Sequence, residues 1–451
     1  MIPTTLARQL RRGLEDHLQA MFPVATPAFR DALPALLGDE PAWFRGPYLT
    51  MALPFREGNR PASDFFRHVT FGRQPYMHQQ QAFARLLDHE PRSTIVATGT
   101  GSGKTECFML PILEHVVRLR DEGVQGVKAV LVYPMNALAT DQARRLARQI
   151  HDDDGLRGRV TAGLYVGDAP ESASMAMTEA DIITDRETLR QHPPDILLTN
   201  YKMLDLLLLR PRDARLWRHN LPGTLRFLVV DELHTFDGAQ GTDLACLVRR
   251  MEARLGHPER PLCVIGTSAT LGQDAGAGAL AAHAGRLFGQ EVPPEAILGE
   301  TRLDLETVLD LDGPRPDTPG DPPVPDPRAV MRLVDDPALA PLELARRLVP
   351  LYFPDWTPAD DGPDASQDAG SHLARELSRR LRPHPWLAAL LRVLGGRTLP
   401  MDDVLAGLGS RLGAFAPDAP GTAPGGLSRA DREALLLGFV ALVAVARVPQ
   451  A

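Results

Sequence analysis

The sequence predicts an α/β fold built on a doubly wound parallel sheet, with mainly helical segments before and after it. From about residue 73 to residue 287, short apolar runs rich in β-branched residues alternate with longer stretches of helical periodicity. The runs lack the apolar and polar alternation of a half-exposed sheet, which is typical of parallel strands covered by helices on both faces. Right-handed crossovers would place helices on both faces.

Polar motifs follow these runs at regular places. Six strands are expected, at Thr94–Ala97, Ala129–Tyr133, Thr161–Tyr165, Ile196–Thr199, Phe227–Val230 and Leu262–Gly266. The motifs ATGTGSGKT, PMNALATDQ, GD, TN, DELH and TSAT come at or just after their ends. Because the carboxyl ends of parallel strands share one edge of a sheet, we expect all six motifs to meet at one cleft.

The flanking segments are different in character. Leu6, Leu10, Leu14, Leu18 and Met21 recur on one helical face, so the chain is expected to begin with an amphipathic helix. We expect residues 1–70 to form an accessory segment packed on the main domain, residues 71–290 to form that domain, and residues 291–451 to form a helical connector with Pro- and Gly-rich linkers. The expected helical segments of the connector are Ala329–Leu351, Ser371–Leu394 and Ser428–Val448.

Composition narrows the class of protein. The 451 residues are 44% hydrophobic and 24% charged, which is ordinary for a globular protein of two or three domains. A net charge of −8 argues against a wholly basic nucleic-acid platform, although a local groove remains compatible with it. Three widely spaced cysteines cannot make a disulfide framework or a four-ligand zinc site. With no secretory signal and no apolar run long enough to cross a bilayer, we expect a cytoplasmic protein with no membrane segment.

The segment from Ala97 to Thr105 carries the most specific chemistry. Glycines let successive backbone N–H groups turn toward phosphate oxygens, Lys104 places a point charge on the β- and γ-phosphates, and the Thr105 hydroxyl binds Mg²⁺. Only three of the 49 basic residues are lysines, and one of them stands here. The alternative is a chance Gly-Ser loop before a helix. The expected ATP-binding residues are Thr98, which replaces the usual first glycine, then Gly99, Thr100, Gly101, Ser102, Gly103, Lys104 and Thr105.

Two adjacent acids complete this chemistry. Asp231 and Glu232 follow an apolar strand. Asp231 would hold Mg²⁺ through water, and Glu232 would orient the attacking water and accept its proton. The alternative is a strand-end turn without catalytic function. With Lys104, the pair supplies the positioning and charge neutralisation that phosphoryl transfer requires.

In motif order the chain resembles the first RecA-like motor domain of superfamily 2 DEAD/DEAH-box helicases, from about Gln74 to Leu271. The stretches VYPMNALATDQ, LLTNYKMLD and VVDELHTFDGAQGTDLACLVRR are similar to those of large bacterial helicases of the MrfA type, including the Druantia defence helicase. The resemblance implies a RecA-like P-loop NTPase fold and an ATP- and Mg²⁺-dependent helicase or translocase. It also implies a single-stranded or duplex nucleic-acid partner, DNA in preference to RNA.

The same resemblance assigns further roles. Tyr76 and Gln79, in PYMHQQ, would hold the adenine, with an ordinary helix start as the alternative. His234 and the tripeptide Ser268-Ala269-Thr270 would couple the nucleotide site to the nucleic-acid groove, with a structural histidine and a helix cap as the alternatives. The residues that would grip one strand by its phosphates are Pro134, Met135, Asn136, Thr199 and Asn200, whereas Gly167 and Asp168 are better explained by turn chemistry.

One feature of these helicases has no counterpart in the sequence. No arginine-rich motif of a second RecA-like domain follows Leu271, and the tail resembles the helical insertion of large relatives, with the chain expected to stop within or just after it. We therefore expect the chain alone to bind ATP but to hydrolyse it poorly, as half of a split motor or as a truncated one. A motor from a restriction system, and a nucleotide-dependent interaction module without turnover, remain alternatives.

Overall fold

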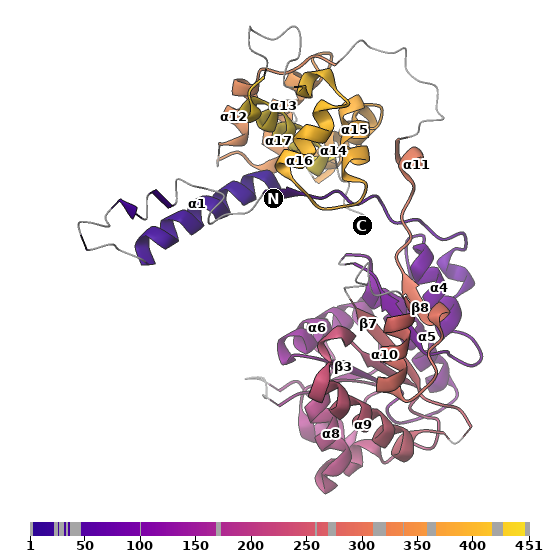
Figure 1. Cartoon of the computed structure of the whole chain (residues 1–451). Coiled ribbons are helices and arrows are strands. Elements are labelled where there is room, and N and C mark those ends of the chain that lie inside the picture. The colour runs from indigo at the N-terminus through magenta and orange to yellow at the C-terminus, as the bar shows by residue number, and fades with distance from the viewer. Residues whose placement is uncertain are drawn as a thin grey trace. The chain divides into compact units, whose positions relative to one another are not determined.

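The computed structural model describes residues 3–21, 26, 31–32, 35–36, 47–99, 101–167, 173–257, 259–268, 277–309, 322–336, 338–358, 367–416 and 427–446. The chain forms two compact units (Figure 1). The α/β unit is Phe55–Arg302, and the helical unit joins Met1–Pro54 to Leu303–Ala451. These boundaries differ from those expected at residues 70 and 290: residues 1–54 group with the C-terminal helices instead of forming a separate accessory segment, and residues 55–70 belong to the α/β unit.

The α/β unit contains a seven-stranded parallel sheet with the order β4-β5-β3-β6-β7-β2-β8. Its strands are β2 (Thr94–Ala97), β3 (Ala129–Tyr133), β4 (Ala162–Tyr165), β5 (Ile196–Asn200), β6 (Phe227–Val230), β7 (Cys263–Ser268) and β8 (Ile297–Gly299). The predicted fold class, a RecA-like doubly wound sheet, is confirmed. All six predicted strands are present within two residues of their expected ends, whereas β8 was not predicted.

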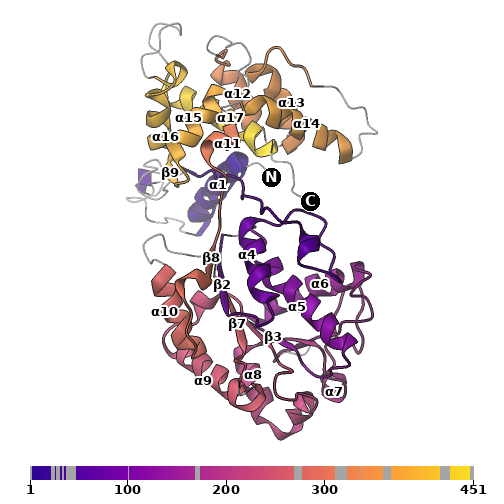
Figure 2. The ribbon, with the colours of Figure 1, turned by 90° about the vertical axis from the view of Figure 1, so that its right-hand side faces the viewer.

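Helices cover both faces of the sheet (Figure 2). On one face lie α4 (Met77–Leu86), α5 (Lys104–Asp121) and α6 (Asn136–Asp152); on the other lie α8 (Tyr201–Leu209), α9 (Gly238–Leu255) and α10 (Ala277–Phe288). The short α7 (Arg186–Gln191) precedes β5. From β2 to β4 the crossovers use the first face, and from β5 to β8 they use the second. The chain therefore changes direction across the sheet at β4, as right-handed crossovers require.

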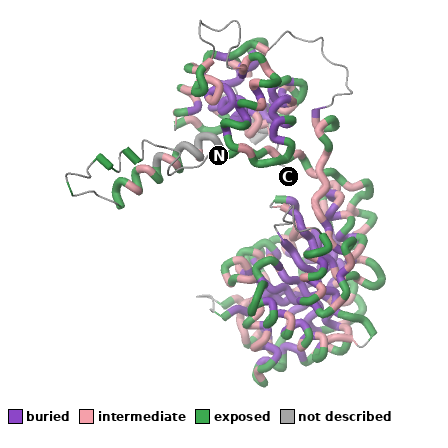
Figure 3. The backbone as a smooth tube through the Cα atoms, viewed as in Figure 1, coloured by how far each residue is buried: buried purple, intermediate pink, exposed green. Residues whose placement is uncertain are grey.

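Strand residues explain why both faces need cover. Along β3, Leu131 and Tyr133 pack under α5 and α6, while Val130 and Val132 pack under the other helices. All four are buried, and the strands form the interior of the unit in Figure 3. Burying a side chain of this size contributes about 1.5–3 kcal/mol, so apolar runs without alternation favour a two-sided sheet.

The helical unit begins with the predicted helix α1 (Pro3–Met21). A two-residue ladder pairs β1 (Tyr48–Leu49) with β9 (Leu399–Pro400) in antiparallel fashion. The helices of the second half are α11 (Leu305–Leu309), α12 (Pro327–Val334), α13 (Pro341–Tyr352), α14 (Gln367–Leu381), α15 (Pro385–Leu394), α16 (Met401–Gly409) and α17 (Arg429–Val445). Two expected helical segments are each divided in two, because Pro341 and Pro385 occupy first helical positions.

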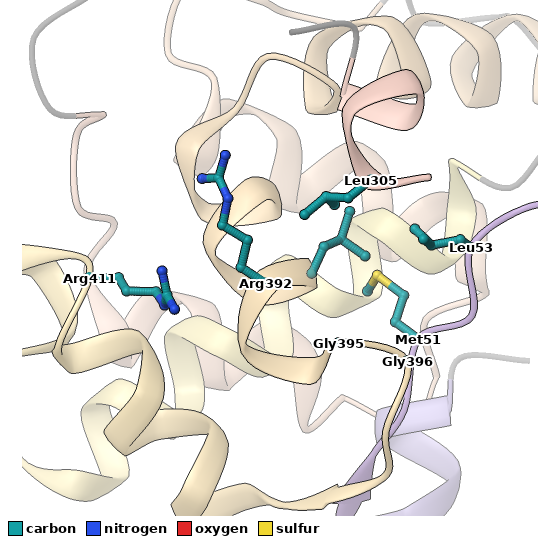
Figure 4. Close-up of a pocket in the computed structure, with 8 residues that line it drawn as sticks. Met51, Leu53, Leu305, Arg392, Gly395, Gly396 and Arg411 are labelled. Carbon is teal, nitrogen blue, oxygen red and sulfur yellow. The ribbon is translucent and has the colours of Figure 1, made fainter. Parts of the chain in front are cut away.

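The core of this unit is aromatic and aliphatic. Trp386 lies against Tyr352, Phe415 and Phe439, and the Tyr352 hydroxyl donates to the Leu435 carbonyl at 2.6 Å. The unit contains a cavity of about 460 Å³ with an apolar side formed by Met51, Leu53, Leu305 and Leu391 and with Arg392 and Arg411 at its edge (Figure 4). None of the predicted functional residues lines it. Among the helices of the described residues, none is both long and apolar enough to cross a bilayer.

Candidate nucleotide-binding site

The predicted P-loop connects β2 to α5 at the carboxyl edge of the sheet. Gly101 and Gly103 have φ of 77° and 75°, in the left-handed region that favours glycine. A Cβ at Gly103 would overlap with Gln79 Nε2, so this position excludes larger residues. Lys104 is the first residue of α5, where backbone N–H groups favour an anion. The segment therefore folds as a phosphate-binding loop requires.

The Lys104 ammonium is the strongest indication that this loop can bind an anion. Its Nζ is buried and forms no hydrogen bond with any described residue. A buried cation is costly unless an opposite charge lies against it, so a phosphate fits this position. Nearby, the Thr98 and Ser102 hydroxyls lie 2.6 Å apart and tie the start of the loop to its end. Thr105 lines an adjoining cavity of about 240 Å³, while Thr100 lies outside the described residues.

Gln79 is buried beside this loop. Its Oε1 accepts from the Tyr76 backbone N–H at 3.0 Å, and its Nε2 donates to the Gly103 carbonyl at 3.3 Å. Tyr76 is also buried, with its ring 5.2 Å from that of Phe55. Both polar ends of Gln79 thus contact protein atoms and support the loop, and recognition of adenine by Tyr76 and Gln79 stays a prediction.

The two predicted acids lie at the same edge, after β6. The Thr267 hydroxyl on β7 donates to Asp231 Oδ1 and accepts from the Glu232 backbone N–H, the latter at 3.1 Å. Glu232 has φ of 51° and is the one non-glycine residue of the described chain with positive φ. Such a conformation costs energy and is concentrated at functional sites. Thr267 was not among the predicted residues, although it directly precedes the SAT tripeptide.

The predicted coupling residues extend this group. His234 Nδ1 lies 3.4 Å from Glu232 Oε2 and 3.5 Å from Ser268 Oγ. The acids after β6 and the end of β7 are therefore joined by side chains as well as by strand pairing. Thr270 lies outside the described residues.

The predicted nucleic-acid residues divide into two sets. Asn200 Nδ2 donates to Asn136 Oδ1 at 2.7 Å, which brings the loops after β3 and β5 together. Met135 is 62% exposed beside them, and Pro134 is partly exposed. Thr199 differs from the expectation: it is fully buried, and its hydroxyl donates to the Tyr165 carbonyl at 2.6 Å. As a residue inside β5, it presents no hydroxyl to a bound strand.

Two further residues contact the P-loop. Glu300, just after β8, accepts through Oε2 from the Gly99 backbone N–H at 3.0 Å, and Arg302 donates to its other oxygen at 2.8 Å. His78 Nε2 donates to the Ser102 carbonyl at 2.8 Å, and burial lowers the pKa of this imidazole. A neutral His78 keeps one proton for that bond. Neither residue was predicted: Glu300 follows β8, whose three residues give little periodicity, and the contact of His78 with Ser102 joins segments that are 24 residues apart in sequence.

Electrostatics also distinguish Tyr133, at the end of β3. Burial, and then the Asp231 carboxylate, raise the pKa of its phenol, and its hydroxyl has no hydrogen-bond partner among the described residues. Tyr133 therefore stays neutral beneath the acids.

Part of the chain is similar in sequence to known proteins. Residues 76–276 match the family described as DEAD/DEAH box helicase. The Druantia protein DruE of Escherichia coli is 28% identical, over 59% of this chain and 20% of its own, and the ATP-dependent helicase Lhr-Core of Methanothermobacter thermautotrophicus is 29% identical, over 43% and 21%. A crystal structure of the DUF1998 helicase MrfA bound to DNA and AMPPNP is 21% identical over 62% of this chain and 38% of its own, with a TM-score of 0.41. The chain thus spans about a fifth of the length of these curated relatives. Within residues 76–276, it contains a helicase domain of the DEAD/DEAH box family.

Proposed function

We propose that the α/β unit is an ATP-dependent helicase or translocase motor that binds ATP with Mg²⁺ at the P-loop. The observation that carries this proposal is the buried Lys104 ammonium, which has no acceptor among the described residues. It stands at the sheet edge that also carries Asp231 and Glu232. An ATP phosphate would supply the missing negative charge, and the main-chain turns at Gly101 and Gly103 leave room for it.

In this proposal, each residue has a defined task. Lys104 holds the β- and γ-phosphates, and Thr105 and Asp231 would hold Mg²⁺, which when bound neutralises phosphate charge. Glu232 orients the attacking water and accepts its proton. Thr267 holds Asp231 by its side chain and Glu232 by its backbone, so both acids keep a fixed direction.

We propose a nucleic-acid strand, DNA in preference to RNA, as the partner of the loops after β3 and β5. Met135, Asn136 and Asn200 offer exposed or partly exposed contacts there, and Pro134 shapes the turn. Short polar side chains and helix N-termini bind phosphates without a basic surface, which suits a net charge of −8. His234 and Ser268 would transmit the state of the γ-phosphate toward these loops.

Efficient hydrolysis is proposed to need an arginine from a second RecA-like half. Such an arginine raises turnover by about 10³- to 10⁵-fold in related phosphoryl-transfer sites. Without it, the unit would bind ATP and turn it over slowly.

The test is ATP hydrolysis by the full chain, with and without single-stranded DNA and with a candidate second-half polypeptide. We expect stimulation by DNA in the reconstituted assembly. Glu232→Gln should retain ATP, stop hydrolysis and strengthen binding of the strand. Tight ATP binding with no stimulated turnover in any mixture would contradict the motor and favour a nucleotide-dependent interaction module.

A further inference from the structure

The α/β unit has a second polar cavity, at the amino ends of its strands and therefore at the edge opposite the P-loop. Its volume is about 340 Å³. Its polar lining includes the side chains of Arg120, Gln125, Thr161, His192, Arg218 and His219. No Asp or Glu side chain is among the described residues that line it.

Arg120 is fixed in this wall by a buried carboxylate. Its Nε and Nη2 each donate at 2.8 Å, to Oδ1 and Oδ2 of Asp195, which is 1% exposed. Nη2 also donates to Thr161 Oγ1 at 3.1 Å. The N–H groups of Nη1 have no acceptor among the described residues. A guanidinium fork is thus oriented in advance, with donors left for a ligand.

The charges around this wall do not balance. Asp195 also accepts from the Lys128 ammonium at 2.7 Å, so one carboxylate faces two cations. Arg218 adds a third cation at the rim, and no described carboxylate pairs with it. Its Nε donates to His219 Nε2 at 2.9 Å.

His115 lies on the same helix, α5, as Arg120. Burial, followed by the charges of Arg118, Arg226 and Lys128, lowers its pKa to about 3. This imidazole is therefore neutral at neutral pH and adds no charge to the region.

We infer that this cavity binds a phosphate group, carried by inorganic phosphate or by the 5′ end of a nucleic-acid strand. The free Nη1 donors of Arg120 and the guanidinium of Arg218 face the cavity, and guanidinium forks match phosphate oxygens in geometry. Gln125, His192 and His219 add further polar side chains to the lining. The site is independent of the ATP site, because it shares no residue with the P-loop or the two acids.

The test uses the full chain carrying Lys104→Ala, so that the P-loop contributes no phosphate binding. Calorimetric titration with inorganic phosphate should detect binding. Arg218→Ala and Arg120→Lys should each weaken it by about tenfold. Arg120→Lys keeps a cation beside the buried Asp195, so we expect this variant to fold. Arg215→Ala, an exposed arginine of the same turn as Arg218, is the matched control and should change nothing.

Single-stranded oligonucleotides of one sequence, with a 5′-phosphate or a 5′-hydroxyl, distinguish the two sources. If the chain prefers the 5′-phosphorylated oligonucleotide and Arg218→Ala abolishes this preference, the site binds a strand end. If the chain binds inorganic phosphate but shows no such preference, the site binds free phosphate. Absence of phosphate binding, or binding that both variants leave unchanged, would overturn the inference. Loss of ATP hydrolysis has no bearing on this result, so failure of the proposed function is separately visible.

Discussion

At the scale of single residues, we propose that nucleotide binding by the P-loop depends on the buried ammonium of Lys104. Lys104→Ala should weaken ATP binding by about a hundredfold, since it removes one partner of a buried charge pair. Fluorescence titration with a labelled ATP analogue measures this. Lys202→Ala removes an exposed lysine of the same unit and is the control. ATP affinity that survives in Lys104→Ala would place the nucleotide elsewhere.

Thr267 should affect turnover more than binding. Thr267→Val removes the hydroxyl that holds Asp231 and Glu232 but keeps the shape of the side chain. Loss of a hydrogen bond to a charged group costs about 1.5–3 kcal/mol, so we expect kcat to fall by about ten- to a hundredfold with a small change in ATP affinity. Thr267→Ser keeps the hydroxyl and should restore most of the rate. Equal rates for the valine and serine variants would show that the hydroxyl is not needed.

Local motifs could be predicted from the sequence, whereas side-chain contacts between neighbouring strands could not. Gly101, Gly103 and Lys104 could be predicted because their chemistry lies within a few consecutive residues. Thr267 and Glu300 were not predicted. The acids that Thr267 contacts and the P-loop that Glu300 contacts are remote in sequence, and they become neighbours only because the strands pair. Thr199 was predicted to contact a nucleic-acid strand, but it lies inside β5 and its hydroxyl donates to the Tyr165 carbonyl.

At the scale of elements, α5 offers a controlled test of the P-loop turn. Gly103 precedes α5 and Gly123 follows it, with φ of 75° and 78°. Alanine at Gly123 meets open space and should cost about 1–2 kcal/mol of unfolding free energy for its left-handed backbone alone. Gly103→Ala adds overlap with Gln79 and should cost more and also weaken ATP binding. Urea unfolding and ATP titration of both variants provide the comparison, and equal losses would contradict a tight Gln79 contact.

The start of α15 should make the helical unit sensitive to acid. His384 caps this helix by accepting from the Trp386 backbone N–H through Nδ1, and burial lowers its pKa to about 4. The ordinary pKa of histidine is 6.5. Between pH 6.5 and pH 4, this histidine is therefore protonated in the unfolded chain but stays neutral in the folded chain. Stability is therefore complete above that window and falls as the pH drops through it, by about 2 kcal/mol from pH 7 to pH 5.

His384→Asn is expected to flatten this dependence, because asparagine caps a helix without titrating. Urea unfolding monitored by tryptophan fluorescence at several pH values checks it. His372→Asn, at an exposed position of α14, is the control and should keep the original slope. An unchanged slope in His384→Asn would assign the acid sensitivity to other groups.

Helices and strands that have long apolar runs or clear stop signals could be predicted from the sequence. Six strands and α1 were predicted close to their observed ends. The tail helices were drawn too long, because apolar periodicity continues across Pro341 and Pro385 although each proline starts a new helix. β8 has three residues, too few to establish a period.

At the scale of the whole molecule, the α/β unit is one continuous segment with its own core. We expect a fragment of residues 55–302 to fold and to bind ATP within about threefold of the full chain, because the predicted ATP-site residues and both layers of core belong to it. Circular dichroism and ATP titration of the fragment check this. A fragment that is unfolded, or folded without affinity for ATP, would show that the site depends on the helical unit.

The helical unit could not be delimited from sequence. It joins the two ends of the chain, and the β1–β9 ladder pairs Tyr48 with Pro400. No local pattern in the sequence indicates a two-residue ladder between such distant segments, so residues 1–70 were expected to form a separate accessory segment packed on the main domain.

The central claim is that Lys104, Asp231 and Glu232 act on one ATP molecule at the carboxyl edge of the sheet. A structure of the full chain with Mg²⁺ and a non-hydrolysable ATP analogue tests it most directly. We predict the Lys104 ammonium on the β- and γ-phosphates and the metal between Thr105 and Asp231, with Glu232 facing the γ-phosphate. A nucleotide bound away from Lys104, or one whose γ-phosphate lies out of reach of both acids, would contradict the account.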